Sequence, residues 1–185
     1  TLCAITALRP KAVKERKPAL VICPASVAHN WAREAARFAP WLKTVVIERG
    51  AGRKAILERA HEYDLVIKNY ALARRDIDEL RARDWLVVVV DEAQAIKNPQ
   101  SEIARTVKDL KSGFRIALTG TPIENRLSDL WSIMDFCVPG YFGTLTQFES
   151  GAKSRGPILT GQILRNRLRP LLLRRMKAEV APELP

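Results

Sequence analysis

Two adjacent carboxylates, Asp91 and Glu92, follow an uninterrupted aliphatic run that ends at Val90. Such a run is typical of a strand buried on both faces of a parallel sheet, and ligands of these sheets bind beyond the carboxyl ends of the strands. One carboxylate can hold a hydrated magnesium ion while the other acts on a water molecule, so the pair predicts a magnesium–nucleotide site. The alternative is a core strand that simply enters a polar loop.

A second polar segment, Thr119 to Thr121 around Gly120, also follows an apolar run. Its two hydroxyls can hydrogen-bond to nearby carboxylates, so we expect them to connect the acidic pair to its surroundings. Taken alone, this segment could be only a turn.

The elements that must position these residues alternate between strand and helix. Strands are predicted at residues 19–23, 44–47, 64–67, 85–90 and 114–118, with helical patterns between them. This alternation predicts an α/β fold, with a parallel doubly wound sheet flanked by helices. It stops after residue 138, so we expect residues 1–138 to form one lobe and residues 139–185 a small helical appendage with a basic connector.

Composition limits the classes of function. The 185 residues include 31 Lys and Arg against 20 Asp and Glu, and the net charge of +11 favours a polyanionic partner. Part of this excess lies in residues 151–177, which carry no acidic residue; a solvated surface is the alternative there. Three scattered cysteines and two histidines argue against a disulfide framework or a zinc site and suit the cytoplasm. No apolar run approaches the length of a membrane span.

A glycine-rich loop that could hold phosphates is the missing part of a nucleotide site. The nearest match to GxxxxGK[ST] is residues 156–163, where Gln162 replaces the lysine and Ile163 replaces the hydroxyl residue. We therefore reject this segment as a phosphate loop.

Five segments together resemble the Swi/Snf family of superfamily-two helicase-like ATPases, and their motif sequences are most similar to those of its prokaryotic members. They are residues 20–31, 64–70, 90–99, 117–131 and 168–177, and the most specific are DEAQAIKNP and LTGTPIEN. The resemblance implies a RecA-like lobe of a motor that uses ATP and Mg²⁺ to move along double-stranded DNA. It also implies a cytoplasmic, nucleoid-associated protein.

The resemblance implies a role for each residue of the nucleotide site. Asp91 would bind magnesium through water, and Glu92 would orient or deprotonate the water that attacks the γ-phosphate. Gln94 stands where most members carry histidine and would hydrogen-bond toward the phosphates or the partner lobe. The segment of Thr119, Gly120 and Thr121 would link the nucleotide state to DNA contacts.

Other matching residues belong to segments that contact DNA in the family: Pro24, Ser26, Asn69, Tyr70, Arg174, Arg175 and Lys177. Ser26 is also a candidate helix cap, and an exposed helix start there offers N–H groups to a phosphate. Asn69 replaces the usual Thr or Ser but can still donate to a phosphate. The three basic residues match the connector into a second lobe, where they would brace the lobes or contact DNA. Trp31 and Trp131 are expected to pack in the core rather than stack on bases.

Thr1 matches the last residue of the family's phosphate loop, whose hydroxyl would coordinate magnesium. The chain would then be most of one lobe of a two-lobe motor, lacking the phosphate lysine and the arginine fingers. Such a lobe alone would hydrolyse ATP negligibly. The expected partners are double-stranded DNA, the second lobe of the same protein and DNA-bound protein complexes, without a membrane. The alternative is a non-catalytic lobe that binds DNA or a protein.

Overall fold

The computed structural model describes residues 1–15, 17–120 and 126–173, without the side chains of residues 10–14. Residue contacts divide the chain into two compact units, Thr1–Phe142 and Gly143–Pro185. The strand–helix alternation predicts the division after residue 138, whereas the contacts place it after Phe142.

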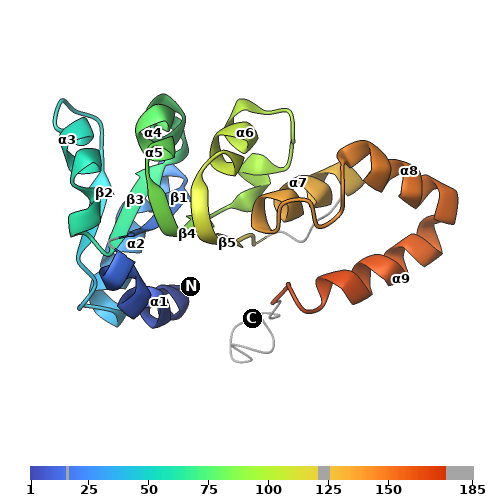
Figure 1. Cartoon of the computed structure of the whole chain (residues 1–185), viewed down its shortest axis with the longest axis horizontal. Coiled ribbons are helices and arrows are strands. Elements are labelled where there is room, and N and C mark those ends of the chain that lie inside the picture. Colours follow the sequence, from blue (N-terminus) through green and yellow to red (C-terminus); the bar gives the residue numbers. More distant parts are fainter. Residues whose placement is uncertain (16, 121–125, 174–185) are drawn as a thin grey trace, which may run out of the picture. The chain divides into compact units, whose positions relative to one another are not determined.

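The first unit is built on a five-stranded parallel sheet in the order β2-β3-β1-β4-β5 (Figure 1). The strands are β1 (Ala19–Cys23), β2 (Thr44–Ile47), β3 (Leu65–Asn69), β4 (Asp84–Val90) and β5 (Lys111–Ala117). In the central strand, Val21 lies between Ile67 of β3 and Val89 of β4. The predicted doubly wound α/β fold is confirmed, and each predicted strand overlaps an observed one.

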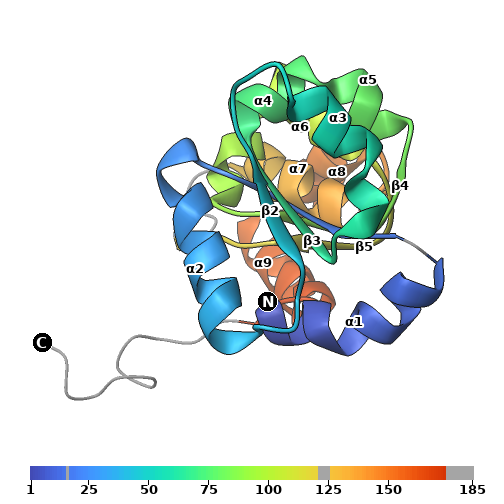
Figure 2. The ribbon, with the colours of Figure 1, turned by 90° about the vertical axis from the view of Figure 1, so that its left-hand side faces the viewer.

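Helices cover both faces of the sheet, as Figures 1 and 2 show. On one face lie α1 (Leu2–Glu15), η1 (Ala25–Val27) and α2 (Ala28–Phe38). On the other lie α3 (Arg53–Glu58), η2 (Ala60–Glu62), α4 (Tyr70–Arg75), α5 (Ile77–Arg81), η3 (Ala93–Ile96), α6 (Glu102–Lys108) and α7 (Leu127–Cys137). None of the helices in the described ranges is both long and apolar enough to cross a bilayer.

Alternate residues of each strand supply two hydrophobic clusters, one on each face of the sheet. Ile22 and Val90 pack with the helices from α3 to α7, whereas Val21 and Val89 pack with α1 and α2. Because β4 lies inside the sheet and is covered on both faces, residues 85–90 are all buried. This double burial explains why β4 has a continuous apolar sequence rather than an alternating one.

Serine residues flank two helices but behave differently. Ser101 caps α6, because its Oγ accepts from the N–H of Ala104 at 3.3 Å. The predicted cap at Ser26 is wrong, because Ser26 lies inside η1 and α2 starts after Val27 without a side-chain cap. Ser26 is exposed instead.

The second unit contains α8 (Leu145–Arg155) and α9 (Pro157–Leu168). Thr144 and Gln147 form a capping box at the start of α8, so this helix carries its own start signal. The Thr160 hydroxyl donates to the carbonyl of Ala152 at 3.1 Å and links the two helices.

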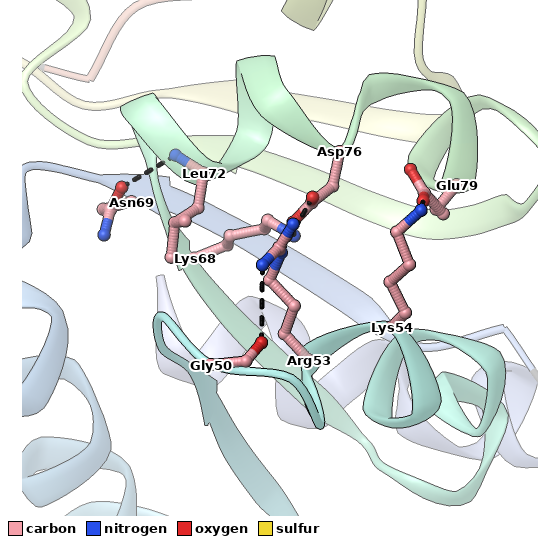
Figure 3. Close-up of polar contacts among 8 residues, drawn as sticks. All are labelled: Gly50, Arg53, Lys54, Lys68, Asn69, Leu72, Asp76 and Glu79. Atoms are coloured by element: carbon pink, nitrogen blue, oxygen red, sulfur yellow. Dashed lines mark hydrogen bonds and ion pairs between the residues drawn. The ribbon is translucent and has the colours of Figure 1, made fainter.

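A buried ionic cluster joins β3 to α3, which precedes it, and to the turn between α4 and α5 (Figure 3). The Lys68 Nζ donates to Oδ2 of Asp76 at 2.6 Å, and the Arg53 Nε lies 2.9 and 3.1 Å from the two oxygens of Asp76. The side chains of Lys68 and Asp76 are 0% and 1% exposed. Arg53 also donates to the carbonyl of Gly50 at 3.3 Å, so the cluster fixes the loop before α3.

The carboxyl group of Asp76 links stability to pH. Burial opposes its ionisation, but hydrogen bonds from Lys68 and Arg53 outweigh this effect and hold the pKa of Asp76 below its ordinary value. Its stabilising contribution is therefore complete above the unfolded pKa of about 3.9 and is lost as the pH falls through the lower folded pKa. We expect urea titrations to show this loss on acidification, and Asp76→Asn to flatten the acid limb. An equally steep acid limb in Asp76→Asn would contradict the assignment.

Candidate functional site

Each polar group of Asp91 is held by a different part of the chain. Its N–H donates to the carbonyl of Ile22 in β1 at 2.8 Å, and its carbonyl accepts from the Tyr70 hydroxyl at 2.6 Å. In the carboxylate, Oδ1 accepts from the N–H of Glu92 at 2.9 Å and Oδ2 accepts from the indole Nε1 of Trp31 at 2.8 Å. Protein groups alone therefore orient this carboxylate at the carboxyl end of β4.

The backbone of Glu92 is left-handed, with φ 54° and ψ 58°. Glu92 is the only residue other than glycine with a positive φ within residues 1–15, 17–120 and 126–173. This conformation costs on the order of 1–2 kcal/mol in a residue with a Cβ atom. The N–H of Ala93 donates to the carbonyl of Leu118 at 2.7 Å and holds the turn. Strain of this kind clusters at functional sites, where the surrounding structure enforces it.

Gln94 connects Glu92 to the segment after β5. The Gln94 Nε2 donates to Oε2 of Glu92 at 2.7 Å, and the Thr119 hydroxyl donates to Oε1 of Gln94 at 3.2 Å. Thr119 thus reaches Glu92 through this amide. The predicted contacts between the threonines and carboxylates stay a prediction. Gly120 follows at an exposed position, and Thr121 lies outside the described residues.

Polar contacts connect α7 to η3, the segment that follows Glu92, and to β5. The buried Ser132 hydroxyl of α7 donates to the carbonyl of Ile96 at 2.7 Å and connects α7 to η3. Arg115 of β5 donates to the carbonyls of Leu110 and Phe136 at 2.7 and 3.2 Å, which ties the end of α6 to α7. The contact of Ser132 thus fixes the end of η3 against α7.

The two tryptophans expected in the core differ in their surroundings. Trp131 is half-buried on α7, and the Lys108 Nζ lies 4.6 Å from the centroid of its ring. The Trp31 ring is half-buried against the cluster shared with α1 and α2, while its N–H reaches Asp91. This second role of Trp31 was not predicted from the sequence. The available signal was its indole N–H, which can only donate and therefore needs an acceptor. Trp31 lies on the helix that follows β1, the strand next to β4.

The candidate DNA-contacting residues in the described part of the chain follow two strands: Pro24 and Ser26 follow β1, and Asn69 and Tyr70 lie where β3 meets α4. Pro24 is half-buried and Ser26 is exposed, both at the carboxyl end of β1. Asn69 caps α4, where its Oδ1 accepts from the N–H of Leu72 at 2.9 Å. Tyr70 points inward to Asp91; burial, followed by the charge of Asp91, raises the pKa of its hydroxyl, which stays a donor at neutral pH.

The remaining candidates are Thr1, at the start of the chain, and three basic residues outside the described part of the chain. Thr1 is exposed before α1, where its carbonyl accepts from the N–H of Ile5 at 3.0 Å. Within the described residues, no hydrogen bond joins Thr1 to Asp91 or Glu92. The basic connector residues Arg174, Arg175 and Lys177 lie outside the described residues.

The residues at the end of β4 fit a magnesium–nucleotide ligand. Carboxylate oxygens are the donors that Mg²⁺ prefers, and this ion usually keeps several water ligands and shares its shell with substrate phosphates. Among the side chains that the structure describes, no group of three or more His, Cys, Asp or Glu could hold a metal ion by itself. A magnesium ion that shares its shell with phosphates and water needs few protein ligands, and Asp91 could be one of them.

These features define a RecA-like α/β lobe with an acidic pair at the end of a central strand. The sequence matches the family described as SNF2-related domain over residues 1–185. The chain thus belongs to the SNF2-related family. This membership confirms the family resemblance inferred from the DEAQ and TGTP segments.

Similar proteins come from bacteria, fungi and archaea. The chain is 42% identical to the putative ATP-dependent helicase/translocase YwqA of Bacillus subtilis and 34% identical to the TATA-binding protein-associated factor mot1 of Schizosaccharomyces pombe. These matches cover 93% and 91% of this chain, but only 20% and 9% of the relatives. The SWI2/SNF2 ATPase core of Sulfolobus solfataricus in complex with dsDNA is 42% identical, with a TM-score of 0.81, over 96% of this chain and 38% of that one.

Proposed function

We propose that this chain forms the first RecA-like lobe of a DNA-dependent ATPase that couples ATP hydrolysis to movement along double-stranded DNA. The observation that carries the proposal is the oriented Asp91–Glu92 pair at the end of β4, with Glu92 held in a left-handed backbone. Membership of the SNF2-related family supports this use of the pair.

The proposed chemistry assigns different work to the two carboxylates. Asp91 holds a hydrated magnesium ion, and Glu92 orients or deprotonates the attacking water. Gln94 holds the Glu92 carboxylate through its amide, and its contact with Thr119 connects this carboxylate to the segment after β5. Magnesium bound with ATP supplies positive charge that stabilises the phosphates during transfer.

The proposed DNA contacts are mainly to phosphates. The net charge of +11 favours a polyanion, and a solved relative at 42% identity is a complex with dsDNA. Ser26 offers an exposed hydroxyl; Pro24 lies beside it, and Asn69 can donate from its amide nitrogen. Tyr70 follows Asn69 directly and belongs to the same proposed DNA-contacting segment, although its hydroxyl donates to the carbonyl of Asp91. Such contacts carry little sequence information, so we propose binding without sequence preference.

Other parts of the proposal concern the complete protein. Thr1 would add a hydroxyl ligand to magnesium, and Arg174, Arg175 and Lys177 would form the connector to a second lobe. DNA-bound protein complexes are further candidate partners, and a DNA substrate would place the protein in the nucleoid of a prokaryotic cytoplasm. The second candidate function is a non-catalytic module that binds DNA or a protein. It stays an alternative because this chain matches only 9% and 20% of the length of two relatives, so their activity does not transfer directly to it.

Duplex-stimulated ATP hydrolysis by the full-length protein tests the proposal. We expect duplex DNA of unrelated sequences to stimulate hydrolysis equally, because the contacts are to phosphates. We also expect the logarithm of the binding constant to fall linearly with the logarithm of salt concentration, with a slope of about −0.9 per phosphate contact. DNA binding without hydrolysis would favour the non-catalytic module. Absence of both at low salt would refute the motor assignment.

A further inference from the structure

Asp91 is the point at which two candidate DNA-contacting segments meet the nucleotide site. Trp31 of α2 donates to its carboxylate at 2.8 Å, and Tyr70 of α4 donates to its carbonyl at 2.6 Å. We propose that Trp31 and Tyr70 are positioning residues that couple DNA binding to the holding of magnesium–ATP by Asp91. This inference rests on the proposed function.

Each of the two donors, Trp31 and Tyr70, lies in the same segment as a candidate DNA-contacting residue. Ser26 lies in η1, which leads through Val27 directly into α2, the helix that carries Trp31. Asn69 immediately precedes Tyr70 and caps the same helical turn through the N–H of Leu72. A displacement of either segment by a phosphate contact therefore moves a hydrogen-bond donor of Asp91.

The two donors act on different atoms of Asp91. The N–H of Glu92 occupies Oδ1, so the indole N–H of Trp31 sets the position of the second carboxylate oxygen. Neighbouring donors that orient a metal-holding carboxylate typically change metal affinity by roughly 10–100-fold. Tyr70 holds the main chain at the peptide that leads into the left-handed residue Glu92. Trp31 thus positions the group that holds magnesium, and Tyr70 positions the turn that carries Glu92.

Coupling of this kind can be measured from binding alone. If DNA binding changes the affinity for magnesium–ATP, magnesium–ATP must change the affinity for DNA by the same factor. The ratio of DNA dissociation constants with and without the nucleotide is therefore a direct measure of coupling, independent of turnover.

The test uses the full-length protein and the variants Trp31→Phe and Tyr70→Phe, which keep the rings and remove the donors. Trp41→Phe is the matched control, because Trp41 follows α2 and is 54% exposed. Anisotropy of a labelled duplex gives the DNA dissociation constant without nucleotide and with magnesium plus a non-hydrolysable ATP analogue. A magnesium titration of analogue binding, without DNA, provides a second readout. Thermal melting confirms that each variant is folded.

We expect the coupling ratio to move toward one in both donor variants, by roughly fivefold or more. Trp31→Phe should also raise the half-saturating magnesium concentration by roughly tenfold. An unchanged ratio in both variants, or an equal loss in Trp41→Phe, would overturn the inference while leaving the motor assignment intact. A wild-type protein that binds DNA equally tightly with and without the magnesium-bound ATP analogue would also overturn the inference. A wild-type protein that does not bind duplex DNA would instead refute the proposed function.

Discussion

Glu92→Gln in the full-length protein is expected to lower kcat for DNA-stimulated ATP hydrolysis by about 10²–10⁴-fold. The substitution keeps the size of the side chain but removes the carboxylate that would orient or deprotonate water. Binding of DNA and of magnesium–ATP should persist, because Asp91 keeps its hydrogen bonds from Trp31 and from the main chain of residue 92. Steady-state kinetics with duplex DNA at saturation measure the effect.

Glu58→Gln is the matched control for this substitution. Glu58 is an exposed residue at the end of α3, so its loss should leave kcat and KM at the wild-type values. Hydrolysis by Glu92→Gln at the rate of the Glu58→Gln control would show that Glu92 is not the catalytic carboxylate.

Asp76→Ala is expected to have the largest effect on stability. It leaves Lys68 buried without its acidic partner, and it removes both oxygens that Arg53 contacts. Breaking a buried ion pair from one side costs roughly 3–5 kcal/mol, because an uncompensated charge stays buried. Hydrogen exchange of the β3 amides in the full-length protein measures the local free energy of opening, even where global unfolding is not two-state.

Two other variants separate the buried charge from general effects of substitution. Asp78→Ala changes an exposed aspartate in α5 and should alter exchange little. Lys68→Met removes the buried cation and leaves Asp76 paired with Arg53, so it should destabilise β3 less than Asp76→Ala does. Equal protection of the β3 amides in Asp76→Ala and Asp78→Ala would show that the cluster contributes nothing to local stability.

The sheet was predictable because its signal is local. A strand covered on both faces needs apolar residues at every position, and residues 86–90 display this requirement directly in the sequence. Asp91 and Glu92 could be placed at its carboxyl end for the same reason. Ser101, directly before α6, is a local signal of the same kind for the start of a helix.

The contacts that connect the site were not predictable, because they join residues far apart in the sequence. Trp31 and Asp91 are 60 positions apart, so the donor-only indole N–H of Trp31 indicated that it needs an acceptor but not which residue supplies it. Lys68 looks like an outward-facing strand residue, since only the fold shows that Asp76 and Arg53 surround it. Ser26 failed as a cap because a 3₁₀ turn moves the start of α2 beyond it.

The left-handed backbone of Glu92 has an evolutionary consequence. Glycine adopts this conformation without steric penalty, so a glycine at position 92 would relieve strain on the order of 1 kcal/mol. Thermodynamic stability alone would therefore not choose glutamate here. A laboratory selection for heat resistance, without a requirement for turnover, should accept glycine at this position, whereas a selection for activity should reject it. These two outcomes together would mark position 92 as a site at which function outweighs stability.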